Sequence, residues 1–176
     1  MTLSDEDRQE RLQGILEAEI EDFVAQCKTL QLATVDEQGN PNVSYSPFVR
    51  NQFGYFILIS LLARHAQNIS SNSQVSMMMI EDEATAKQIY ARKRLTFDAT
   101  GVRVQRETKL WQQVVKQMME RFGDIVADLT QLNDFNLIQF QPDQGLFVKG
   151  FGQAYQLTGE ELVSTQPVRG RGNSSH

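Results

Sequence analysis

The side chains that could do chemistry gather at two places in this sequence: a basic cluster and a histidine that follows an arginine. Arg92, Lys93 and Arg94 are consecutive, a run too short for a nucleic-acid tail but long enough to hold one anionic small ligand. His65 follows Arg64 directly and could touch an acidic group of a ligand, or could equally be an ordinary connector residue. Both places favour an acid-bearing small molecule as the ligand.

Residue spacing excludes several familiar chemistries. The histidines are His65 and His176 and the one cysteine is Cys27, so no cluster has the spacing of a zinc site. A catalytic triad built on His65 would need a nucleophile elbow, and the sequence has none. Gly150-Phe151-Gly152 has the first two glycines of a dinucleotide fingerprint but lacks the third, and it opens a predicted strand rather than a helix.

Composition narrows the class of protein further. The 176 residues carry a net charge of −5 with a pI near 5.1, which argues against general nucleic-acid binding. No apolar run approaches the roughly 20 residues that a membrane-spanning helix needs, and the acidic N-terminus is not typical of a secretory signal. A single cysteine suits a reducing compartment. We therefore expect a cytoplasmic protein with neither a nucleic-acid nor a membrane partner.

The elements that position these side chains are mostly strands. Residues 29–60 read as a β-meander, with period-2 alternation interrupted by turns at 36–41 and 50–54. Pro47 indicates an edge or a bulge in the second strand. The run 55–60 is apolar on both faces, which predicts a strand between two covering layers. Three consecutive methionines, 77–79, favour core packing over a metal site.

Helices flank the strands. Residues 6–28 show an apolar stripe at three- and four-residue spacing, with Ser4 as the expected N-cap. Residues 62–70 predict a connector or short helix, 83–91 a short amphipathic helix, and 107–122 a long helix that ends at Gly123. The remaining strands are predicted at 74–80, 95–104, 135–141 and 144–157, with Pro142-Asp143 as a turn between the last two.

Strands outnumber helices and follow one another directly, which favours a mainly β (α+β) fold with an antiparallel sheet closed into a small barrel. We predict one domain over residues 1–166, with the helix at 6–28 and the barrel at 29–157. Residues 167–176 have the composition of a flexible C-terminal tail.

Motifs distributed along the chain resemble a known family. The segments LQLATVDEQGNPNVSYSPFV, GYFILIS, ARHAQN and QVSMMMIEDE resemble the FMN-binding split-barrel superfamily of pyridoxamine 5′-phosphate oxidase. Within it, ARKRLTFDA, LWQQVVKQMMERFGDI, LNDFNL and QPDQGLFVKGFGQAYQL are more similar to the HutZ/HugZ family of heme utilization proteins. The similarity runs from about residue 11 to residue 162. It implies a six-stranded antiparallel split barrel that works as a homodimer, with ligand sites between the subunits.

The resemblance also implies roles for particular residues. Asp134 matches the family's acid that crosses the dimer interface to hydrogen-bond the iron-binding histidine; the alternative is a strand-start aspartate that bonds its own backbone. Arg94 matches a pocket arginine that faces a heme propionate or a ligand on the open side of the iron; the alternative is a solvated surface arginine. In the flavin branch, Arg64, Arg94 and Ser60 would lie near the FMN phosphate.

The sequence departs from this family in its tail. The family places its iron-binding histidine in the C-terminal segment, where the ungapped match puts Gly172. The only histidine downstream is His176, which would reach the iron only if the tail folds back; the alternative is a terminus with no ligand role.

Three functions follow from the resemblance. The first is a heme-binding, heme-degrading oxygenase that opens the ring and releases iron, with an unidentified redox partner. The second is an FMN-dependent oxidoreductase. The third is a heme carrier or storage protein without turnover.

Overall fold

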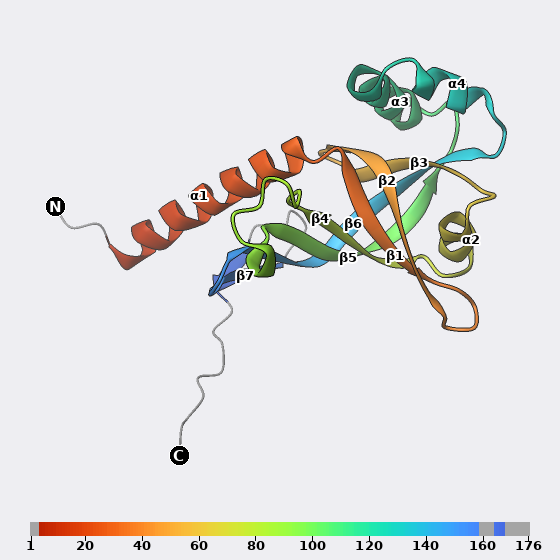
Figure 1. The fold of residues 1–176 in the computed structure, drawn as a ribbon. Coiled ribbons are helices and arrows are strands. Elements are labelled where there is room, and N and C mark those ends of the chain that lie inside the picture. Colours follow the sequence, from red (N-terminus) through yellow and green to blue (C-terminus); the bar gives the residue numbers. More distant parts are fainter. Residues whose placement is uncertain (1–3, 159–163, 168–176) are drawn as a thin grey trace.

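The computed structural model describes residues 4–158 and 164–167, and Figure 1 shows its fold. In chain order, the elements are α1 (Asp5–Gln26), β1 (Thr29–Val35), β2 (Pro41–Asn51), β3 (Gly54–Ser60), α2 (Arg64–Ser71), β4 (Gln74–Ile80), the 3₁₀ turn η1 (Ile89–Ala91), β5 (Arg94–Val104), α3 (Lys109–Phe122), α4 (Ile125–Gln131), β6 (Phe135–Gly150), β7 (Gln153–Thr158) and β8 (Ser164–Pro167). No helix in the described part of the chain has the length and apolar character needed to cross a membrane.

Six strands form a closed antiparallel barrel, as the sequence predicts. The strand order is β3-β2-β1-β4-β5-β6, and pairing of β3 with β6 closes the circle. The hairpin partner β7 continues outward from β6, and β8 pairs with β7. The predicted tail at 167–176 lies outside the described residues, except for Pro167 at the end of β8.

The apolar residues divide between the barrel interior and an outer layer. Ile57 on β3 belongs to the interior, together with Met77, Phe97 and Phe140 on other strands. Phe56, its neighbour on β3, belongs to a second cluster that includes Val114 and Met118 of α3. Figure 1 shows α3 and α4 together beside the barrel. Strand β3 is therefore covered on both faces, which confirms the prediction made from its continuous apolar run.

Helix α1 begins at the predicted cap and packs on the barrel only through its later turns. Ser4 and Asp7 form a capping box at its N-terminus. Leu16 and Phe23 are buried against the barrel, but Leu12 and Ile15 of the predicted stripe are 65% and 55% exposed. The helix extends past the end of the barrel in Figure 1, which is why its first turns have no strand to pack against.

The helix predicted at residues 83–91 is wrong. This segment is a loop with a single 3₁₀ turn, η1. The side chain of Asp82 accepts a hydrogen bond from the Ala84 backbone N–H at 2.8 Å, so local turn bonds replace the helical ones. Ile89 and Tyr90 are 59% and 89% exposed. Because this apolar face has no surface to pack on, amphipathic spacing alone does not stabilise a helix here.

The turn predicted at Pro142-Asp143 is also wrong, because β6 runs without a break through both residues. Pairing with β3 ends at Phe140 and pairing with β7 begins at Gln144. Between them, β6 has only β5 beside it, and the β5–β6 register shifts there. A proline in this stretch therefore costs no ladder bond on its open side. The chain instead reverses at residues 150–153, where Gly152 has a φ of 68°.

Candidate functional site

Ser60 and Asp134 meet where the barrel closes. Ser60 ends β3 and pairs with Phe135, the first residue of β6, which places Asp134 beside it. The Ser60 hydroxyl donates to Asp134 Oδ2 at 2.5 Å, and the backbone N–H of Leu61 donates to the Asp134 carbonyl at 2.8 Å. These residues are 74 positions apart in sequence, and strand closure alone brings them together.

Arg64 and His65 follow closely, at the start of α2. Arg64 lies 3.6 Å from Asp36 in an ion pair, with its side chain 56% exposed. His65 is half-buried, and its Nε2 atom has no hydrogen-bond partner in the described structure. Burial lowers the pKa of His65 from its ordinary value of 6.5, because desolvation disfavours the charged imidazolium. The neutral imidazole is thus favoured at this end of the barrel.

Arg94 lies elsewhere, near the other end of β6. It begins β5 and pairs with Val148 on β6. Its neighbours in the basic cluster are neutralised locally: Arg92 pairs with Glu83, and Lys93 pairs with Glu19 at 3.1 Å. Arg94 donates only to the carbonyl of Arg92, at 3.2 Å, and makes no ion pair in the described residues. It is therefore the member of the cluster whose charge is available for an anionic group.

The structure thus brings together some of the predicted site residues and separates others. Ser60, Asp134, Arg64 and His65 lie at the α2 end of the barrel. Arg94 lies beside Val148, which follows Asp134 by 14 positions along β6. That separation is a strand length of about 45 Å at the usual rise per residue. Figure 1 shows β6 running from the α4 side of the molecule to β7. His176 lies outside the described residues.

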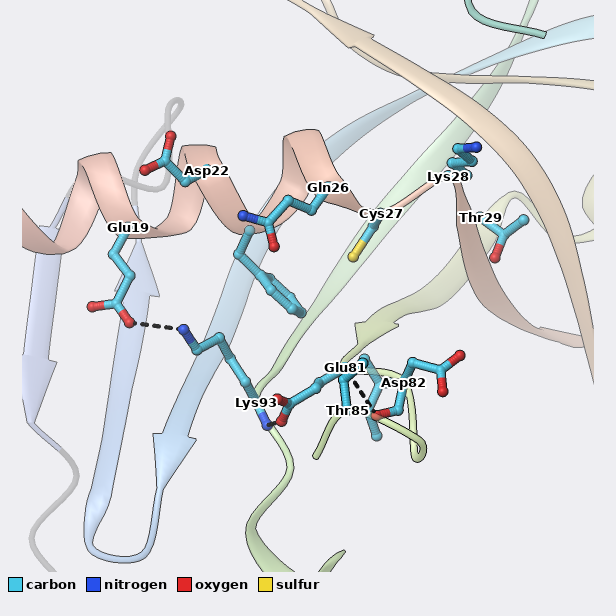
Figure 2. Close-up of a pocket in the computed structure, with 12 residues that line it drawn as sticks. Glu19, Asp22, Gln26, Cys27, Lys28, Thr29, Glu81, Asp82, Thr85 and Lys93 are labelled. Carbon is cyan, nitrogen blue, oxygen red and sulfur yellow. Dashed lines mark hydrogen bonds and ion pairs between the residues drawn. The ribbon is translucent and has the colours of Figure 1, made fainter. Parts of the chain in front are cut away.

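A pocket of about 620 Å³ lies between α1 and the loop after β4, and no motif in the sequence predicts it. Figure 2 shows Lys93 reaching toward Glu19 across it. Four carboxylates and two lysines line it: Glu19, Asp22, Glu81, Asp82, Lys28 and Lys93. A pocket with excess negative charge repels an acid-bearing ligand, so we do not assign the ligand site to it.

Arg106 is a residue that sequence reasoning missed. Its guanidinium donates to the carbonyl oxygens of Thr130, Leu132 and Phe135, each at 2.7 Å. These carbonyls lie on both sides of Asp134 in the chain. No motif marks Arg106, because its partners are backbone atoms, which leave no sequence signature.

The donor set defines what the described residues can do chemically. They contain no group of three or more His, Cys, Asp or Glu side chains that could hold a metal ion. They do offer a carboxylate acceptor at Asp134 and a cation without an acidic partner at Arg94. These groups fit a small molecule that carries acidic substituents. If that molecule contains a metal ion, the ion needs at most one coordinating side chain from the protein.

Comparison with known proteins first gives two sequence matches. The family model described as pyridoxamine 5′-phosphate oxidase matches residues 16–149. The chain is 65% identical over 156 residues to a Vibrio cholerae protein named heme oxygenase HutZ, covering 89% of each chain.

Solved structures agree with these matches. A crystal structure described as HutZ, the heme storage protein from Vibrio cholerae, is 60% identical, with a TM-score of 0.74 and coverage of 77% of this chain and 96% of that one. The crystal structure of Campylobacter jejuni ChuZ is 30% identical, with a TM-score of 0.82. That match covers 93% of this chain and 66% of the ChuZ chain.

Proposed function

This chain belongs to the pyridoxamine 5′-phosphate oxidase family and, within it, to the HutZ family of heme proteins, and on that premise we propose that two copies of it bind heme between them and degrade it oxidatively. The observation that carries the ligand assignment is the 65% identity to heme oxygenase HutZ over 89% of the chain. The reaction opens the ring and releases the iron. The cytoplasm is the proposed compartment, which the single free cysteine supports.

The placement of the site residues supports a site shared by two subunits. Asp134 and Arg94 lie toward opposite ends of β6, farther apart than one small ligand bridges within a subunit. We propose a two-fold dimer in which the Asp134 end of one chain lies against the Arg94 end of the other. Val43 and Tyr45 on β2 are 75% and 68% exposed, an apolar surface that a second subunit would cover.

Each residue has a proposed role at that site. Arg94 holds an acidic substituent of the ring, because its guanidinium has no competing acid in the described residues. Asp134 accepts a hydrogen bond from the partner subunit and so orients the group that binds the iron. His176 is the proposed iron ligand from the tail. Heme, when bound, supplies the oxygen chemistry, and an unidentified reductase supplies the electrons.

The flavin alternative is less well supported by the geometry, although the family match includes FMN-binding proteins. Ser60 has one O–H, and it is engaged with Asp134. Arg64 is paired with Asp36. An FMN phosphate would have to displace these two contacts before Ser60 and Arg64 could hold it.

Parallel titrations with hemin and FMN test the proposal. We expect hemin to give a shifted Soret band with an end point near one hemin per chain, and FMN to leave its own spectrum and the melting temperature unchanged. A flavin spectrum that saturates in place of the Soret change would favour the oxidoreductase.

Two further arms separate turnover from storage. Stoichiometric hemin that stays intact under ascorbate and oxygen would select the storage function, a role that one HutZ structure's description supports. A variant ending at Pro167 keeps β8 and removes residues 168–176, so loss of the Soret shift in it would support an iron ligand in the tail.

A further inference from the structure

The turn that carries Asp134, residues 132–135, is held from its backbone side by Arg106. One guanidinium nitrogen donates to the Thr130 carbonyl in α4, and the other donates to the carbonyls of Leu132 and Phe135. Hydrogen bonds from a charged donor are about twice as strong as neutral ones. Arg106 therefore fixes the end of α4 and the start of β6 relative to each other, with Asp134 between them.

The carboxylate of Asp134 is held separately, by Ser60. The Ser60 hydroxyl donates to Oδ2 at 2.5 Å while its own oxygen accepts the backbone N–H of Leu62 at 3.1 Å. Because a carboxylate oxygen accepts and the Leu62 N–H is itself a donor, the one hydroxyl proton of Ser60 points at Asp134. The Asp134 carbonyl also accepts the side-chain N–H of Asn136 at 3.0 Å.

These contacts leave one oxygen of the carboxylate available. Oδ2 is bonded to Ser60, while Oδ1 has no hydrogen-bond partner in the described residues and Asp134 makes no ion pair there. The side chain is half-buried, which limits how far it can rotate. A half-buried carboxylate with one fixed and one open oxygen is set to accept a single N–H donor in a defined direction.

We propose that Ser60 and Arg106 are positioning residues for Asp134: Arg106 fixes the turn, and Ser60 fixes one carboxylate oxygen so that the other accepts an N–H group from the partner subunit. This inference rests on the proposed function for its effect on heme, and on this chain's own contacts for the geometry. It assigns Ser60 to Asp134 rather than to a phosphate. The competing interpretation is that the Ser60 contact only helps to close the barrel between β3 and β6.

The first experiment tests the contact between Ser60 and Asp134 in protein without any cofactor. The carboxyl carbon of Asp134 is observed by ¹³C NMR in wild-type protein, in Ser60→Ala and in Ser70→Ala. Ser70 also carries a hydroxyl, but it bonds only to the Ala66 carbonyl in its own helix. We expect the Asp134 signal to move in Ser60→Ala and to stay in place in Ser70→Ala. An unchanged signal in Ser60→Ala would overturn the proposal.

The second experiment separates heme affinity from turnover. Loss of a group that orients an iron ligand typically costs 10- to 100-fold in activity. We expect Ser60→Ala and Arg106→Lys to open the ring at least about tenfold more slowly, with hemin affinity within about twofold of wild type. Arg106→Lys keeps the charge but loses the fork that reaches three carbonyls. Arg103→Gln, an exposed arginine of β5, is the control and should match wild type.

The outcomes distinguish this inference from the proposed function. If wild-type protein binds hemin and turns it over, and Ser60→Ala does so at the wild-type rate, the positioning role is refuted while the function stands. If wild-type protein does not bind hemin, the function fails, and the NMR result then shows only whether Ser60 contacts the Asp134 carboxylate.

Discussion

Asp134 and Arg94 lie toward opposite ends of strand β6: Asp134 directly precedes the first residue of the strand, and Arg94 pairs with Val148, two residues before its end. The proposed function assigns both residues to one ligand site, but one subunit keeps them apart. If both serve one ligand, each must come from a different chain. We therefore expect a dimer in which each ligand site is built from both chains.

Replacing Asp134 by Asn should stop ring opening without releasing hemin. The amide keeps the size of the side chain and can still accept the Ser60 hydrogen bond, but it loses the negative charge that strengthens an N–H donor's interaction. We expect ascorbate-driven ring opening to fall by a factor of 10 to 100 or more, with the Soret titration unchanged. Asp128→Asn, an exposed acid on α4, is the control. Full ring-opening activity in Asp134→Asn would show that Asp134 has no role at the site.

His65 should make stability depend on pH in a predictable direction. Burial lowers the pKa of His65 below 6.5 in the folded protein, so the unfolded chain binds more protons between that lowered pKa and 6.5. The stabilisation is complete above pH 6.5 and is lost as the pH falls through that window. Urea unfolding from pH 8 to pH 5 should therefore show a smaller decline for His65→Gln than for wild type. Parallel curves for the two proteins would show that His65 is not buried as described.

Glu19 should contribute modestly to docking of α1. Burial raises the pKa of Glu19, but hydrogen bonds from Lys149 and Lys93 outweigh burial and bring it below 4.5. Its stabilisation is thus present above pH 4.5 and is lost as the pH falls further. We expect Glu19→Gln to lower the free energy of unfolding by about 1 kcal/mol at pH 7, and less in high salt. Glu17→Gln, on the same helix, should have little effect, and an equal loss in both variants would argue against the lysine contacts.

Two glycines should respond to alanine in opposite directions. Gly54 has a φ of 119°, and a Cβ there would collide with the carbonyl oxygen of Phe140, so Gly54→Ala should cost more than about 2 kcal/mol. Gly14 lies in the exposed part of α1 with nothing within 4 Å of a Cβ. Gly14→Ala should stabilise the protein by up to about 1 kcal/mol. Thermal and urea unfolding measure the stability of both variants. A Gly54→Ala protein as stable as wild type would contradict the backbone geometry at the start of β3.

The sequence predicts the barrel because the strand pattern is local. The alternation in β1 predicts a strand with one buried face, and the continuous apolar run of β3 predicts a strand buried on both faces. The structure confirms both predictions. The errors arise where the neighbours decide the structure. Pro142 is tolerated in β6 because β3 has already ended and β7 has not begun, and no local pattern contains that information. The segment 83–91 has helical spacing but no surface to cover.

The candidate site was only partly predictable for the same reason. The resemblance points to Asp134 and Arg94, but only the register of β6 with β3 and β5 shows how far apart they lie. The contact of Ser60 with Asp134 joins positions 74 residues apart, and it depends on which two strands close the barrel. Arg106 acts on backbone carbonyls, which every residue has, so its role could not be predicted from residue types.

The measurement that tests the shared site most directly is complementation between two inactive variants. Arg94→Gln and Asp134→Asn are each purified alone and then co-expressed, so that mixed dimers form. If each site takes Arg94 from one subunit and Asp134 from the other, a mixed dimer holds one intact site, and random pairing restores about a quarter of the sites. We predict ring opening in the co-expressed protein at about that fraction of wild type. Activity no higher than that of the separate variants would contradict a site built from two chains.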